Sequence, residues 1–96
     1  MDIEEIKKTI DAEKPVLAGR FKVKEIGVFG SFARGEQDDG SDVDVLVSFS
    51  EPVGFFAFLD LEEHLEGVLG RKVDLVTRKA LKPGIGRNIL RELVTI

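Results

Sequence analysis

The chain contains no cysteine, so it can form neither a disulfide nor a thiolate metal site, and it has no cysteine nucleophile. Any metal that it binds must therefore be held by oxygen atoms. No apolar run approaches the roughly 20 residues of a membrane-spanning helix. Residues 1–11 are charged and helix-patterned, unlike a signal peptide. These absences predict a cytoplasmic protein without a membrane partner.

The chain also lacks an excess of positive charge. Its formal net charge is −4 at pH 7, which does not favour nucleic acid as a partner. It has neither the lysine of a Walker phosphate loop nor a Gly-x-Gly-x-x-Gly pattern, so those two phosphate-binding folds are disfavoured. Hydrophobic residues make up 43% of the 96 residues, which excludes a disordered chain and predicts a single domain over residues 1–96.

The hydrophobic pattern predicts helices that alternate with short strands. Helices are expected over residues 2–14, just after Gly30, over 55–69 and after Pro83-Gly84, and strands over 25–30, 43–49 and 72–77. This order predicts an α/β (α+β) fold, with a small mixed sheet of three to four strands flanked by helices. His64 stands among glutamates on the polar face of helix 55–69, so we expect it to be solvated and to carry no chemistry.

A candidate phosphate site begins at Gly30 and Ser31, where the first strand runs directly into a short helix. The first N–H groups of a helix have no partner within it and attract anions. Ser31 can serve as an ordinary helix cap as well as a phosphate ligand. Arg34 either reaches the phosphate or pairs with Asp42 or a loop acid, and the pattern leaves both roles open.

Three aspartates form a candidate metal site. Asp42 and Asp44 stand two residues apart at the head of the second strand, so their side chains share one face. Such acids often face water at a sheet edge, but here they precede an apolar run, where uncompensated carboxylates are costly without a cation. Asp74 lies between Val73 and Leu75 on an apolar strand, so its side chain is on the opposite face from theirs. It is either a charge that faces water at the sheet edge or a third carboxylate of the metal site. Together they suit Mg²⁺ and phosphoryl chemistry.

The segments 30–35, 41–47 and 73–76 together resemble the minimal nucleotidyltransferases of the DNA polymerase β-like superfamily. The resemblance implies a nucleotidyltransferase palm in which Gly30 and Ser31 contact the triphosphate of an NTP. It implies that Asp42 and Asp44 hold Mg²⁺. It also implies that Asp74 completes the metal site and takes the proton from the acceptor.

The resemblance also implies a function. It indicates transfer of AMP, or another NMP, from an NTP to an acceptor, with ATP as the expected donor. Members of this size resemble antitoxins encoded beside a HEPN-domain toxin, which some of them modify with AMP. The alternative is a non-catalytic or nucleotide-regulated binding protein that neutralises its partner by occlusion. The sequence leaves the acceptor, the preferred base, the number of metals and a homo-oligomeric state open.

Overall fold

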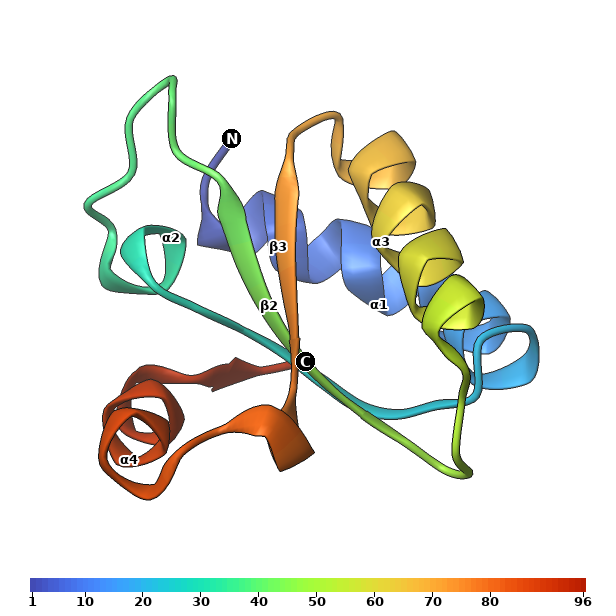
Figure 1. The fold of residues 1–96 in the computed structure, drawn as a ribbon. Coiled ribbons are helices and arrows are strands. Elements are labelled where there is room, and N and C mark those ends of the chain that lie inside the picture. Colours follow the sequence, from blue (N-terminus) through green and yellow to red (C-terminus); the bar gives the residue numbers. More distant parts are fainter.

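The computed structural model describes residues 1–96 and contains a four-stranded sheet with the strand order β3-β2-β1-β4 (Figure 1). The strands are β1 (Val23–Phe29), β2 (Val43–Phe49), β3 (Val73–Thr77) and β4 (Val94–Thr95). β1 is antiparallel to both β2 and β4, whereas β2 and β3 are parallel. This mixed sheet confirms the predicted fold class.

Four α-helices and one short 3₁₀ helix accompany the sheet. They are α1 (Ile3–Gly19), α2 (Ser31–Arg34), α3 (Phe55–Leu69), η1 (Arg78–Ala80) and α4 (Pro83–Glu92). Figure 1 shows α1 and α3 together against the sheet, with α4 apart from both. None of the helices combines the length and the apolar character needed to cross a membrane.

The core lies between one face of the sheet and α1, α2 and α3. Alternation along β2 directs Val43, Val45 and Val47 into this core, and all three are buried. Because Asp44 lies between Val43 and Val45, the same alternation directs it to the opposite face. The core residues from the helices are Ile6, Ile10, Leu17, Phe32, Leu61, Leu65 and Leu69.

The first helix is longer than its sequence predicts, and the expectation that it ends before Pro15 is wrong. Pro15 lies inside α1, although a proline within a helix costs about 3 kcal/mol. The reason is Leu17, which is 1% exposed and joins Ile6 and Ile10 in the core. Burial of a leucine side chain contributes about 1.5–3 kcal/mol, which offsets much of the proline cost.

The expectation that His64 is solvated is also wrong. Its Nε2 lies 2.6 Å from Glu13 Oε1, and its ring centroid lies 5.0 Å from that of Phe21. Packing of α1 against α3 accounts for the difference, because it brings Glu13 beside His64. His64 therefore joins two helices and lies away from the aspartates.

The sheet has a fourth strand, β4, whose position the sequence does not predict. β4 contains only two residues, too few for a pattern, and pairs with Gly27 and Val28 of β1. A Cβ atom on Gly27 would lie 2.7 Å from Leu93 Cδ1, so glycine allows the chain to pass closely here. These contacts tie the end of α4 to the outer face of β1, opposite the core.

Candidate active site

The site is organised around Gly30, where β1 ends and α2 begins. Gly30 has φ 75° and ψ −153°, a backbone conformation that is essentially restricted to glycine. A Cβ atom at this position would overlap the carboxylate oxygen Oδ2 of Asp44. Glycine therefore permits both the sharp turn and the close approach of the turn to Asp44.

Gly30→Ala is expected to lower the free energy of unfolding by about 1–3 kcal/mol through backbone strain, and to displace the Asp44 carboxylate. The matched control is Gly70→Ala, because Gly70 also has a positive φ, 67°, but nothing lies within 4 Å of its Cβ position. Both variants should lose stability in urea unfolding, whereas only Gly30→Ala should lose the predicted ATP binding. Equal ATP binding by both variants would contradict this role of Gly30.

Asp44 is the centre of the acidic cluster. In the sheet it lies opposite Phe29 of β1 on one side and Asp74 of β3 on the other. Burial raises the pKa of Asp44, and the negative charges of Asp74 and Asp42 raise it further, whereas Arg34 lowers it. The structure thus brings Asp42, Asp74 and Arg34 close to the half-buried carboxylate of Asp44.

The loop that leads into Asp42 is held by contacts that the sequence analysis missed. Asp38 Oδ1 accepts a hydrogen bond of 2.8 Å from the Gly40 N–H, which closes a turn within the loop. Arg71, just before β3, donates to the carbonyl oxygen of Asp38 at 3.1 Å and lies over the ring of Phe32. The loop is therefore fastened to the strand that carries Asp74.

The chemistry of these side chains fits a divalent cation. Carboxylate oxygens are the ligands that Mg²⁺ prefers, and Asp44 is a half-buried acid with two negative neighbours. In the structure no three acidic or histidine side chains lie in an arrangement that could hold a metal ion together. Mg²⁺ usually keeps several waters and takes substrate phosphate oxygens, so few protein ligands suffice. Binding of Mg²⁺ by Asp42, Asp44 and Asp74 stays a prediction.

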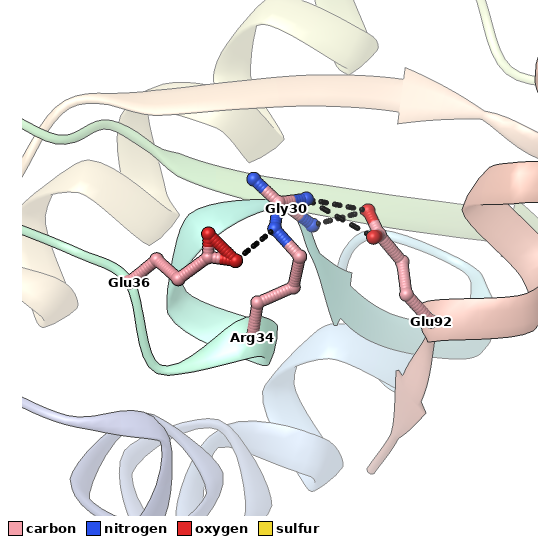
Figure 2. Close-up of polar contacts among 4 residues, drawn as sticks. All are labelled: Gly30, Arg34, Glu36 and Glu92. Atoms are coloured by element: carbon pink, nitrogen blue, oxygen red, sulfur yellow. Dashed lines mark hydrogen bonds and ion pairs between the residues drawn. The ribbon is translucent and has the colours of Figure 1, made fainter.

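Arg34 lies between two glutamates rather than on Asp42 (Figure 2). Its Nε donates to Glu36 Oε1 at 3.1 Å, and its Nη1 donates to Glu92 Oε2 at 3.0 Å. Glu36 is the loop acid of one predicted role, so the structural pairing of Arg34 is confirmed. These hydrogen bonds raise the pKa of Arg34, with the bond to Glu92 as the largest cause. Its contact with phosphate stays a prediction.

Glu92 is the site residue that sequence reasoning missed. It ends α4, and its Oε1 accepts a hydrogen bond of 2.9 Å from the N–H of Gly30 (Figure 2). This bond is the main cause of the lowered pKa of Glu92. Ser31 follows Gly30 as the first residue of α2 and is partly buried. The predicted phosphate site therefore already contains one carboxylate from the end of the chain.

A separate hollow of about 620 Å³ lies at the other end of β2, away from the aspartates. Its lining includes Phe49, Val53, Phe55, Phe58 and Arg78. None of the predicted site residues lines it. Its volume alone therefore does not mark the place of the chemistry.

Comparisons with known proteins agree with one another. A family model described as the nucleotidyltransferase domain matches residues 3–96. The chain is 49% identical over 96 residues to protein adenylyltransferase MntA of Thermococcus cleftensis, covering 100% of this chain and 97% of that protein. It is 43% identical over 95 residues to a protein of Methanocaldococcus jannaschii assigned as a protein adenylyltransferase, covering 98% of this chain and 97% of that protein.

Solved structures give the same fold. A protein assigned as a minimal nucleotidyltransferase superposes with a TM-score of 0.85 at 36% identity, covering 100% of this chain and 97% of that chain. A toxin–antitoxin crystal structure with AMP-PNP superposes with a TM-score of 0.72 at 23% identity, covering 88% of this chain and 70% of that chain. At that identity the second likeness concerns the fold alone.

Proposed function

Because the chain belongs to the nucleotidyltransferase domain family, we propose that it transfers AMP from ATP to a partner protein in a Mg²⁺-dependent reaction. The observation that carries the proposal is the gathering of Asp42, Asp74 and Arg34 around Asp44, beside the turn at Gly30. A protein acceptor is supported by the name of the Thermococcus relative, which is alike over the full chain.

The order of these groups across the sheet suggests how the substrates lie. Arg34 and Gly30 follow β1, Asp44 is on β2, and Asp74 is on β3, an edge strand. A triphosphate over Arg34 and the start of α2 places its α-phosphorus near Asp44. The exposed Asp74 then faces an acceptor that approaches from the open edge of the sheet.

In this arrangement the acceptor oxygen bonds to the α-phosphorus while the bond from that phosphorus to the bridging oxygen of the β-phosphate breaks. Asp74 takes the proton of the acceptor hydroxyl, and Arg34 stabilises the charge that develops on the departing pyrophosphate. When bound, Mg²⁺ supplies positive charge that orients and neutralises the phosphate oxygens. The chain itself contributes mainly by positioning the reacting groups and by stabilising the charge that develops on the phosphates.

The proposed acceptor is a HEPN-type toxin, which makes this chain the antitoxin of a pair. The test is mass spectrometry of such a partner after incubation with this protein, ATP and Mg²⁺. We expect the partner mass to increase by one or more adenylyl groups, and the increase to require all three components. A neutralised partner of unchanged mass would contradict the proposed transfer.

Neutralisation by occlusion is the second candidate, favoured by the large apolar side chains of Phe55, Phe56 and Ile85, which are exposed and available to a partner. The double variant Asp42→Ala, Asp44→Ala distinguishes the two functions. Transfer requires that this variant fails to neutralise the partner while still binding it in a pull-down. Neutralisation equal to that of the wild type would show that occlusion suffices.

ATP and Mg²⁺ are expected to bind with positive coupling. Asp42, Asp44 and Asp74 repel the triphosphate and one another, whereas a cation shared by carboxylate and phosphate oxygens removes both repulsions. In a thermal-shift matrix of ATP against Mg²⁺, the two together should raise the melting temperature by more than the sum of the separate shifts.

Asp42→Asn, Asp44→Asn provides the control for this coupling. The double variant should lose the coupling and still bind ATP through Ser31 and Arg34, because its carboxylates no longer repel the phosphates. Strictly additive shifts in the wild type would contradict the shared site.

A further inference from the structure

Glu92 connects the end of the chain to the turn that starts α2. Its Oε1 accepts the N–H of Gly30 at 2.9 Å and Nη1 of Arg34 at 3.2 Å, and its Oε2 accepts Nη1 of Arg34 at 3.0 Å. Figure 2 shows this carboxylate facing both partners, from the last turn of α4. The Glu92 side chain therefore holds both the Gly30 backbone and the Arg34 guanidinium at the predicted triphosphate site.

The guanidinium of Arg34 is held from two sides. Glu36 engages Nε and Glu92 engages Nη1, which leaves the Nη2 amino group without a protein partner. A guanidinium is planar and rigid, so fixing Nε and Nη1 also fixes the direction of the Nη2 donors. Arg34 can thus offer oriented hydrogen bonds to an anion without releasing either glutamate.

Glu92 is itself held in place by the residues that follow it. Leu93 packs against Gly27, Val94 and Thr95 pair with β1, and the N–H of Ile96 donates to the carbonyl of Ile26 at 3.0 Å. These contacts hold the backbone of Glu92 beside the turn, so the carboxylate can leave Gly30 and Arg34 only by rotation of its own side chain. Its three hydrogen bonds oppose that rotation, which favours a fixed support.

The contact adds little to the stability of the fold. The side chains of Arg34 and Glu92 are 44% and 28% exposed, and ion pairs between exposed side chains contribute little to stability. The hydrogen bond from Gly30 lowers the pKa of Glu92, so the carboxylate is ionised at neutral pH. The main consequence of the contact is therefore orientation.

We propose that Glu92 is a positioning residue of the nucleotide site, which presets the Gly30 turn and the Arg34 guanidinium for the triphosphate. The proposal rests on the proposed nucleotidyl transfer and adds a residue of α4 to it. In this role Glu92 touches neither the nucleotide nor the acceptor. It acts through Gly30 and Arg34, and it makes the C-terminal segment necessary for nucleotide binding.

The test compares Glu92→Ala, Glu92→Gln and a control, Glu63→Ala, which removes an exposed glutamate of α3 that forms no ion pair. The dissociation constant of ATP, KM and kcat are measured for each with Mg²⁺ present. Loss of the residues that orient metal ligands typically costs 10–100-fold in affinity or activity, and Glu92 orients Gly30 and Arg34 in a comparable way. We expect Glu92→Ala to raise the dissociation constant and KM by about 10-fold or more, with a smaller change in kcat.

Glu92→Gln separates position from charge, because the amide oxygen of glutamine still accepts hydrogen bonds from Gly30 and Arg34. We expect it to restore a large part of ATP binding, and Glu63→Ala to match the wild type. In ¹⁵N-edited NMR spectra, the Gly30 amide resonance should shift in Glu92→Ala and much less in Glu92→Gln. A role in folding alone would instead lower the melting temperature without changing the affinity of the folded protein for ATP.

Two results would overturn the role of Glu92. Tighter ATP binding by Glu92→Ala would show that the carboxylate competes with the triphosphate for Gly30 and Arg34. Unchanged binding and KM, with an active wild type, would show that the contact is incidental. Failure of the wild type to bind ATP or to transfer AMP would instead contradict the proposed function, so the two failures are distinguishable.

Discussion

Asp44→Asn is expected to lower the rate of AMP transfer by on the order of 10³-fold or more. Asp44 is the carboxylate around which Asp42, Asp74 and Arg34 gather, and it is the aspartate nearest the Gly30 turn. Asparagine has nearly the same shape but no charge, so it fits beside Gly30 and still cannot neutralise a cation. The measurement is the rate of labelled AMP incorporation into the partner at saturating ATP and Mg²⁺.

The same variant should gain stability in the absence of ligands. Burial and two negative neighbours raise the pKa of Asp44, so its ionised form is unfavourable in the folded protein at neutral pH. Asp44→Asn should therefore melt at a higher temperature than the wild type. Asp60→Asn, at an exposed position on α3, should change neither the rate of AMP transfer nor the melting temperature. Full activity of Asp44→Asn would refute the proposed mechanism.

Val45→Asp is expected to unfold the protein. Val45 is 0% exposed and lies between Val28 of β1 and Leu75 of β3 in the sheet. The variant loses about 1.5–3 kcal/mol of hydrophobic burial and adds a buried, unpaired carboxylate that costs several kcal/mol. Small domains have only about 5–15 kcal/mol of stability in total. Circular dichroism and urea unfolding at neutral pH measure the effect.

Val45→Ala is the matched control for the added charge. It removes methyl groups from the same site and should cost about 1–3 kcal/mol, which leaves a folded protein with a lower melting temperature. If Val45→Asp stayed folded with an unchanged melting temperature, Val45 would not face the core. The assignment of Asp44 to the opposite face would then be wrong as well.

The sequence predicted the parts of this protein that depend on neighbouring residues. The alternation of β2 over residues 43–49 and the helical stripe over 55–69 appear at those residues in the structure. Asp42 and Asp44 were placed on one face because side-chain direction repeats every two residues in a strand. The turn at Gly30 was predicted because a strand that ends in Gly-Ser can bend into a helix.

Contacts between distant segments could not be read in this way. The expected end of α1 before Pro15 follows a strong local rule, and burial of Leu17 in a core made by other segments offsets much of the proline cost. β4 is two residues long, and only its pairing with β1 defines it. His64 lies against Glu13 and Phe21 because two helices separated in the sequence pack together.

Glu92 shows the limit most clearly. In the sequence it is one more charged residue near the end of an amphipathic helix, typical of a solvent-facing side chain. The structure places it on the N–H of Gly30, 62 residues earlier, because Leu93 and β4 anchor the end of α4 to β1. Sequence periodicity specifies which way a side chain points from its own element. Only the packing of α4 and β4 against the sheet determines that Glu92 points at the turn.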